Sequence, residues 1–371
     1  MRIGVPKEVK NHEYRVGLSP ASVAVLVQQG HDVWVQQHAG TAIGFSDDDY
    51  RAAGAQLATD AAAVFHAAEL IVKVKEPQPQ ELAFIQPHHR LFTYLHLAPD
   101  PHLTQALLRS GCTAIAYETV TDAQGRLPLL APMSEIAGRI AVQAGAHCLE
   151  MASGGRGVLL AGAPGVPAAD VLVLGGGVVG RNAVAIAVGM GARVTVLDTS
   201  LSVLRELDAR YGNRIHTQVS TPAVLDELLP QCDLLIGAVL VPGSAAPKLV
   251  RRAHLARMRR GAVIVDVAID QGGCVETSHA TTHEDPTFIV DEVVHYCVAN
   301  MPGAVARTST VALNNATLPF IIKLAEQGYR NALLADPHLL HGLNVMAGKI
   351  TCKEVAVAHN LAYTDPLTLL N

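Results

Sequence analysis

The chain has 371 residues, of which 50% are hydrophobic and 16% charged, and its net charge is −5. This length exceeds what one hydrophobic core usually supports and predicts about two domains. The composition is too apolar for a disordered chain, while Asp170 and Arg181 interrupt its most apolar region, which excludes a membrane-spanning helix. The sequence has no basic stripe of the kind that binds nucleic acid.

The N-terminal segment lacks the apolar stretch of a secretion signal, because Glu8 and Lys10 interrupt it. The six cysteines are widely spaced, which favours reduced thiols over a disulfide framework. The histidines at 88–89 and at 279 and 283 lack further ligands at metal-site spacing, so no metal is predicted. We therefore expect a cytoplasmic protein. Its apolar composition suggests surface buried between subunits, so we also expect a homo-oligomer.

Short apolar segments alternate with helical patterns along the first part of the chain, which favours parallel sheets with crossover helices. Strands are predicted at residues 2–5, 31–35, 70–74 and 91–95, and a helix at 20–29. A long helix is predicted to begin near Ser134, which can act as its N-cap, and to end before Gly154.

From residue 169 onward the pattern changes to closely spaced strands and helices. A strand at 171–174, a helix at 178–190 and a strand at 193–197 are followed by strands at 234–236, 262–267, 288–290 and 293–297. Helical periodicity returns after Gly303. We therefore predict an α/β protein. Residues 134–307 would form a Rossmann domain with a doubly wound parallel sheet, and residues 1–133 and 308–371 a second, discontinuous α/β domain.

A glycine-rich segment follows the strand at 171–174 and opens the next helix. Gly175 permits a tight turn, Gly177 lets backbone N–H groups approach a pyrophosphate, and Gly180 lets helix and strand pack closely. Asp198 ends the next strand, where it suits hydrogen bonds from ribose hydroxyls. Its carboxylate would repel a 2′-phosphate, so NAD is favoured over NADP. The alternative is a βα turn with structural glycines and a surface Asp.

Four ionisable side chains lie at predicted strand ends or in nearby loops, where ligands of open α/β sheets bind. Lys75 and His96 end two apolar strands, Asp270 follows a later strand, and Arg15 precedes the first helix. Each has an ordinary alternative, since Lys75 and Arg15 could be solvated charges and His96 a core residue with satisfied hydrogen bonds. Asp266 competes with Asp270 but lies inside its strand, which favours a structural role.

Eight segments spread over nearly the full length carry long, specific motifs. They are Ile3–Glu8, Arg15–Pro20, Val72–Pro77, Tyr94–Ala98, Ala131–Glu135, Leu174–Gly180, Asp266–Gly273 and His295–Gly303. Together they resemble the alanine dehydrogenases, which are related to the NAD-binding part of nicotinamide nucleotide transhydrogenase. The resemblance implies reversible oxidative deamination of L-alanine to pyruvate and ammonia, with hydride transfer from Cα to nicotinamide C4. It also implies a homohexamer.

The resemblance further implies roles for individual residues. The substrate-binding positions of the family fall on Arg15 and Lys75, and its proton-transferring catalytic positions on His96 and Asp270. The positions around the cofactor fall on Ser134, Val178, Val179, Asp198, Ser220, Val239, Leu240, Val267, Ala268, Ile269, Asp270, Val298, Ala299, Asn300 and Met301.

The sequence departs from the family pattern at two positions. Val203 stands where many relatives have Lys or Arg beside the adenosine, and Ala306 stands where Pro is common. The first departure bears on cofactor contacts, and neither touches the expected chemistry.

Three other functions compete with this interpretation. One is a dehydrogenase of the same build that acts on another amino acid, such as the saccharopine-forming type. Another is the cofactor-carrying subunit of a proton-pumping transhydrogenase, and the third is a catalytically silent NAD-binding module. The silent module would have no need of Arg15, Lys75, His96 and Asp270 together.

Overall fold

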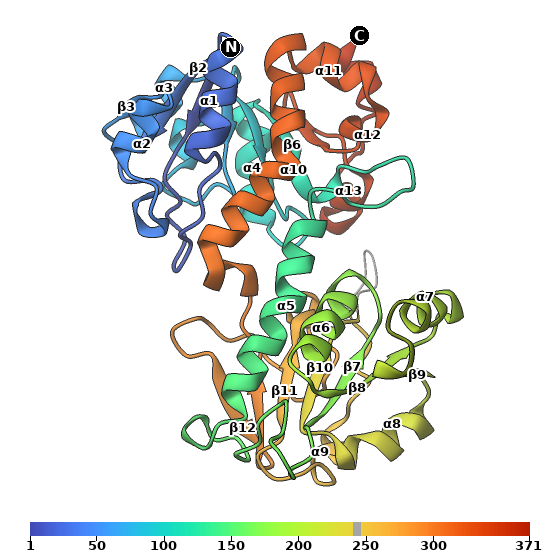
Figure 1. Ribbon diagram of the computed structural model, residues 1–371. Helices are drawn as coiled ribbons and strands as arrows, with labels where there is room; N and C mark the ends of the chain where they lie inside the picture. Colours follow the sequence, from blue (N-terminus) through green and yellow to red (C-terminus); the bar gives the residue numbers. More distant parts are fainter. Residues whose placement is uncertain (240–245) are drawn as a thin grey trace. The chain divides into compact units, whose positions relative to one another are not determined.

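A computed structural model describes residues 1–239 and 246–371 of the protein. The chain divides into two compact units (Figure 1). Unit 1 consists of Met1–Pro132 and Val305–Asn371, and unit 2 of Met133–Ala304. The divisions expected from the sequence lie at residues 134 and 307. Unit 1 is discontinuous, because both ends of the chain contribute to it.

A mixed sheet forms the centre of unit 1. Its strands are β1 (Arg2–Val5), β2 (Asp32–Gln36), β3 (Gln56–Ala58), β4 (Leu70–Val72), β5 (Arg90–Thr93), β6 (Thr113–Ala116), β14 (Leu343–Met346) and β15 (Lys349–Ile350). They follow the order β15-β14-β6-β5-β4-β1-β2-β3. All neighbouring pairs from β6 to β3 are parallel, as the alternation of strands and helices predicts. At the other edge β14 pairs antiparallel with both β6 and β15. The tight β14–β15 connection contains Ala347 and Gly348 at positive φ, the conformation that short hairpins favour.

Side-chain caps mark the start of several α-helices of unit 1. They are α1 (Pro20–Gln28), α2 (Asp47–Ala52), α3 (Ala61–Ala67), α4 (Pro101–Ser110), α10 (Ala306–Gln327), α11 (Tyr329–Ala335), α12 (Pro337–Leu340), α13 (Lys353–His359) and α14 (Leu367–Leu370). The 3₁₀ turns are η1 (Thr41–Ile43), η2 (Leu82–Phe84) and η3 (Tyr117–Thr119). In α1, for example, Ser19 caps the helix by accepting a hydrogen bond from Ser22 N, Pro20 occupies the first turn, and Gly30 follows at φ 81°.

Helix α10 ties the C-terminal segment to the N-terminal one. Asn314 of α10 accepts hydrogen bonds from Ser19 N at 2.6 Å and Ser22 Oγ at 2.8 Å, and its Nδ2 donates to the Gly17 carbonyl at 3.1 Å. Thr310 Oγ1 accepts from Val16 N. These buried hydrogen bonds fix the segment that follows Arg15.

A second sheet forms the centre of unit 2. Its strands are β7 (Asp170–Leu174), β8 (Arg193–Asp198), β9 (Ile215–Val219), β10 (Leu234–Gly237), β11 (Val263–Asp266), β12 (Thr287–Val290) and β13 (Val293–Tyr296). Their order is β12-β13-β11-β10-β7-β8-β9, with every pair parallel except β12 with β13. The chain therefore winds outward from β7 in both directions, which is the Rossmann order with an antiparallel strand added at one edge.

The helices of unit 2 are α5 (Ala131–Cys148), which begins at the end of unit 1, α6 (Val178–Gly189), α7 (Leu201–Tyr211), α8 (Pro222–Leu228) and α9 (Arg252–Leu255). The 3₁₀ turns are η4 (Met151–Ser153), η5 (Gly212–Arg214), η6 (Leu229–Gln231), η7 (Val267–Gln271) and η8 (Met301–Val305). The N-cap predicted at Ser134 is wrong, because α5 begins three residues earlier and Ser134 lies inside its first turns. None of the helices in the described ranges has the length and apolar character that crossing a bilayer requires.

The close approach of β7 and α6 leads to a prediction about stability. A Cβ added at Gly180 would overlap the carbonyl oxygen of Gly175, whereas one at Gly189, in the same helix, would meet no atom within 4 Å. We expect Gly180→Ala to lower the free energy of unfolding by about 1–3 kcal/mol through overpacking. The matched variant Gly189→Ala should leave it unchanged or raise it by up to about 1 kcal/mol. Chemical denaturation measures both, and equal effects would contradict the packing argument.

Candidate active site

Three of the predicted functional residues follow neighbouring strands of unit 1. Arg15 lies in the loop after β1, Lys75 lies three residues past β4, and His96 lies three residues past β5. Because β1, β4 and β5 are adjacent and parallel, these loops leave the same edge of the sheet. Strands β4 and β5 end earlier than the sequence predicts, so Lys75 and His96 belong to loops.

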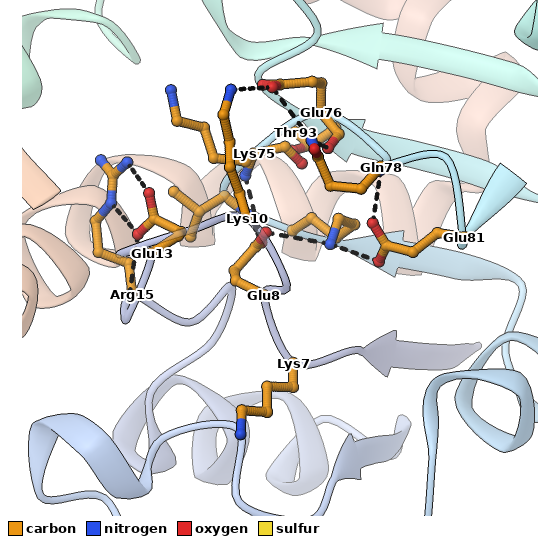
Figure 2. A network of polar contacts seen from close by, with 12 residues as sticks. Lys7, Glu8, Lys10, Glu13, Arg15, Lys75, Glu76, Gln78, Glu81 and Thr93 are labelled. Atoms are coloured by element: carbon orange, nitrogen blue, oxygen red, sulfur yellow. Dashed lines mark hydrogen bonds and ion pairs between the residues drawn. The ribbon is translucent and has the colours of Figure 1, made fainter. Parts of the chain in front are cut away.

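Arg15 is a buried cation held by a buried carboxylate. Its Nε donates to Glu13 Oε1 at 2.7 Å and its Nη2 to Glu13 Oε2 at 2.6 Å (Figure 2). Burial alone would lower the pKa of Arg15, but the hydrogen bonds and charge of Glu13 outweigh burial and raise it. The guanidinium is therefore permanently charged and rigidly oriented.

Lys75 is half-buried, and its ammonium is placed differently from that of Arg15. Its backbone N–H donates to Glu8 Oε1 at 3.3 Å, and its carbonyl accepts from Thr93 Oγ1 at 2.9 Å. Within the described parts of the chain, Nζ of Lys75 has no hydrogen-bond or ion-pair partner. Burial, followed by the charge of Arg15, lowers its pKa. Lys75 therefore presents a cation that an incoming anion can bind.

A buried network of charges supports this loop. Lys73 Nζ binds Glu8 Oε2 at 3.2 Å and Glu81 Oε1 at 2.8 Å, and all three side chains are about 99% buried. Glu8 Oε1 accepts from Val74 N at 2.7 Å, and Glu81 Oε2 accepts from Gln78 N at 2.8 Å (Figure 2). Sequence reasoning did not single out this network. Its one signal is a lysine inside the apolar run of residues 70–74.

His96 occupies a turn with an unusual backbone conformation. Its φ is 49°, in the left-handed region, and its side chain is 45% exposed. Its backbone N–H donates to Glu118 Oε1 at 2.6 Å, and its ring lies nearly parallel to that of Tyr94, with centroids 5.8 Å apart. His96 is therefore accessible and held by neighbours, unlike a core histidine. Sequence reasoning missed both Glu118 and Tyr94 as its neighbours.

The glycine-rich segment of unit 2 forms an open turn at the carboxyl end of β7. Gly175 has φ 93°, which favours glycine, and Gly177 is the N-cap of α6. No side chain caps this helix, and a Cβ at Gly177 would meet no atom within 4 Å. The first N–H groups of α6 can therefore bind an anion, since the helix dipole favours negative charge there.

Asp198 ends β8 beside this turn. Its Oδ2 accepts from Gly176 N at 2.7 Å and its Oδ1 from Ser200 N at 2.7 Å. Val203 lies against the same turn, because a Cβ added at Gly176 would come within 2.5 Å of Val203 Cγ1. This turn therefore fits a dinucleotide whose ribose carries no 2′-phosphate: its glycines are open, its helix is uncapped and a carboxylate lies beside it.

The other predicted cofactor positions also belong to unit 2. Ser134 lies in α5, and Val178 and Val179 open α6. Others follow the carboxyl ends of parallel strands: Ser220 after β9, Val239 after β10, Val267, Ala268, Ile269 and Asp270 in η7 after β11, and Val298, Ala299, Asn300 and Met301 after β13. Leu240 lies outside the described residues.

Asp270 and Asp266 differ in their surroundings. Asp270 is exposed in η7 of unit 2, and its carboxylate has no hydrogen-bond or ion-pair partner among the described residues. Asp266 is fully buried and accepts hydrogen bonds from Cys274 N at 3.2 Å and Val275 N at 3.1 Å. Asp266 therefore shapes the loop that follows Asp270, as expected for a structural residue. Residues 1–239 and 246–371 contain no cluster of three or more side chains that could hold a metal ion.

Comparison with known proteins gives consistent matches over the whole chain. The models of the alanine dehydrogenase/PNT family match it at residues 4–137 (N-terminal domain) and 141–353 (C-terminal domain). Alanine dehydrogenases from Halomonas elongata and Mycolicibacterium smegmatis are 59% and 51% identical to it, with all of both chains covered.

Solved structures agree with these matches. An L-alanine dehydrogenase superposes with a TM-score of 0.95 at 52% identity, over 97% of this chain and 99% of the other. A transhydrogenase from Sinorhizobium meliloti superposes with a TM-score of 0.81 at 26% identity, over 95% and 99% of the two chains. The α/β architecture and the resemblance noted in the sequence are thus confirmed, and this chain belongs to the alanine dehydrogenase/PNT family.

Proposed function

We propose that this protein catalyses the reversible, NAD-dependent oxidative deamination of L-alanine to pyruvate and ammonia. The observation that carries the proposal is the arrangement at one edge of the unit 1 sheet. There Lys75 offers an ammonium without a partner in the described structure, Arg15 offers an oriented guanidinium, and His96 offers an accessible imidazole. Family membership supports the same reaction, since the relatives are alanine dehydrogenases.

Arg15 and Lys75 would bind the substrate carboxylate and the neighbouring carbonyl. Both are charged donors, and hydrogen bonds between ionised groups are about twice as strong as neutral ones. Arg15 is fixed by Glu13, so its donors are oriented before substrate arrives. Holding the substrate at two points removes much of the entropic barrier to the reaction.

His96 and Asp270 would handle the protons of the reaction. NAD, when bound, accepts the hydride that leaves the substrate Cα. His96 would hold or release a proton at the oxygen of the reacting carbon, and Asp270 would orient the water that attacks it. Both side chains are exposed in their own units, as groups that meet a substrate must be.

The fit of unit 2 to NAD rests on the turn after β7. The N–H groups at the start of α6 would bind the pyrophosphate, and Asp198 would accept hydrogen bonds from the ribose hydroxyls. A carboxylate at this position disfavours a 2′-phosphate and so favours NAD over NADP.

We also propose that the protein is a cytoplasmic homohexamer. Large apolar side chains lie exposed on the single chain, among them Met151 at 73% and Leu159 at 68%. Exposed apolar side chains of this kind are often covered by another subunit, and the resemblance to the alanine dehydrogenases implies six copies. Light scattering should therefore give about six times the chain mass of 39.1 kDa.

A single assay tests the proposed reaction against its competitors. The purified protein should oxidise NADH when pyruvate and ammonium are both present. A dehydrogenase of the saccharopine type would instead require 2-oxoglutarate and lysine. A transhydrogenase subunit, which the likeness to the Sinorhizobium structure keeps as the second candidate, would need a second nicotinamide nucleotide. Absence of turnover with pyruvate and ammonium would overturn the proposal.

Removal of the imidazole tests the role of His96. We expect His96→Ala to lower kcat by ~10²-fold or more, because general acid–base catalysis contributes on that scale. NADH affinity, measured by fluorescence titration, should change little. His102→Ala, an exposed histidine of α4, is the matched control and should keep normal turnover. A near-normal kcat in His96→Ala would refute the assignment.

The pKa of Lys75 predicts how substrate binding depends on pH. Burial and Arg15 lower this pKa from the ordinary value of 10.5, so the ammonium loses its proton, and its attraction for a carboxylate, at a lower pH than an ordinary lysine. As the pH is increased, the KM for pyruvate should therefore begin to rise before pH 10.5 is reached. In Lys75→Arg the guanidinium stays charged, so this rise should disappear. Lys349→Arg, at an exposed lysine, should keep the wild-type profile. An unaltered profile in Lys75→Arg would assign the titration to another group.

Removal of the carboxylate beside the glycine turn tests cofactor selectivity. Asp198→Ala eliminates both the ribose acceptor and the charge that repels a 2′-phosphate. We expect the ratio of kcat/KM for NADPH to that for NADH to rise by about 10-fold or more, since one lost hydrogen bond to a charged group is worth ~1.5–3 kcal/mol. Asp208→Ala, an exposed carboxylate of α7, is the control. Unchanged selectivity in Asp198→Ala would count against this role.

A further inference from the structure

Glu118 lies beside the turn that carries His96, although the two are 22 positions apart in the sequence. Glu118 belongs to η3, which follows β6, and β6 pairs in parallel with β5, with Ala116 opposite Thr93. The loops that follow these two strands therefore leave the sheet side by side. This pairing brings the carboxylate of Glu118 to the backbone of His96.

The carboxylate of Glu118 holds the backbone of this turn. Leu95 N donates to both of its oxygens, at 3.1 and 3.2 Å, and His96 N donates to Oε1 at 2.6 Å. His96 adopts φ 49°, a left-handed conformation that is unfavourable for a residue with a Cβ. Hydrogen bonds from backbone N–H to an ionised carboxylate are strong enough to offset such a cost. Glu118 thus stabilises the conformation that presents the imidazole.

The same carboxylate also faces one edge of the imidazole. Oε1 of Glu118 lies 4.0 Å from Nδ1 of His96. The ring of Tyr94 lies nearly parallel to the imidazole, with an interplanar angle of 9°. Tyr94 is itself anchored, because its hydroxyl donates to the Leu129 carbonyl at 2.6 Å. One face and one edge of the imidazole are therefore defined by fixed neighbours.

We propose that Glu118 is the positioning residue of His96. Its carboxylate holds the turn and favours the tautomer with a proton on Nδ1, because that N–H points its positive end at the negative charge. Nε2 then carries the lone pair that exchanges a proton with the substrate. A separation of 4.0 Å exceeds a hydrogen bond, as is common for catalytic contacts before substrate binds. This inference rests on the proposed function of His96.

Substitutions at Glu118 separate its charge from its contacts with the backbone. In Glu118→Gln the amide oxygen can still accept from Leu95 N and His96 N, but the charge beside Nδ1 is lost. We expect kcat to fall by about 10-fold or more, with KM for pyruvate and NADH affinity within a factor of about two, because the interaction acts on the chemical step. In Glu118→Ala the loss should be larger, and added formate should restore part of kcat by supplying a carboxylate.

Two controls accompany these variants. Asp60→Asn alters a carboxylate that accepts a backbone N–H from Ala63 at 2.8 Å at the start of α3, outside the site, and should leave kcat unchanged. Formate should not restore His96→Ala, because that variant lacks the imidazole on which the carboxylate acts. A kcat for Glu118→Gln equal to that of the wild type would overturn the proposal, while pyruvate turnover by the wild type would leave the proposed function intact.

A spectroscopic measurement decides the tautomer without relying on turnover. Nitrogen-15 NMR of histidine-labelled protein distinguishes a protonated from an unprotonated ring nitrogen, and His96→Asn identifies the His96 signal by its loss. We expect neutral His96 to carry its proton on Nδ1 in the wild type and to shift toward the Nε2–H form in Glu118→Gln. A wild-type His96 protonated on Nε2 would overturn the proposal, whether or not the enzyme acts on alanine.

Discussion

The chemistry proposed for unit 1 would depend on one positive charge that no neighbouring carboxylate neutralises. The ammonium of Lys75 has no hydrogen-bond or ion-pair partner in the described structure, although acidic side chains surround its loop. Each of these carboxylates is bound to another cation: Glu8 and Glu81 to Lys73, Glu13 to Arg15, and Glu76 to Lys10. In the proposed reaction, a substrate carboxylate would therefore meet at Lys75 an ammonium that is already partly desolvated and is bound by no carboxylate of the described structure. Desolvation strengthens that attraction, because it lowers the local dielectric constant.

The buried pairs around Lys75 are better explained by placement than by stability. Taking a carboxylate and an ammonium out of water costs several kcal/mol per ion, and pairing rarely returns more than this. Glu8 divides its carboxylate between the ammonium of Lys73 and the backbone N–H groups of Val74 and Lys75. An apolar side chain could fill the same space, but it could not accept the backbone hydrogen bonds that fix the position of residues 74 and 75 after β4. The network thus sets the position of the Lys75 backbone, and this position in turn determines where the Lys75 side chain lies.

The sequence predicts the parts of this structure that depend on local pattern. The alternation of strands and helices and the glycine turn between β7 and α6 can be recognised from neighbouring residues alone. The start of α5 could not be recognised in this way. Ser134 is a good capping residue, and the helix nevertheless begins before it, at Ala131. Local sequence patterns also do not predict which residues the charged side chains contact. Glu118 reaches His96 only because β6 pairs with β5, and Glu8 reaches Val74 across 66 positions.

The two units solve the problem of binding an anion in different ways, and the difference follows from what each would bind. In unit 2 the donors are backbone N–H groups at the start of α6, which any side chain sequence could supply as long as the glycines allow close approach. In unit 1 the proposed donors are the charged side chains of Arg15 and Lys75, because a small substrate would offer few atoms for recognition. Backbone N–H donors do not distinguish one phosphate from another, so the proposed preference for NAD over NADP would depend on Asp198. The proposed substrate selectivity of unit 1 would depend on the arrangement of paired and unpaired charges, and that arrangement is set by loops that only the assembled sheet brings together.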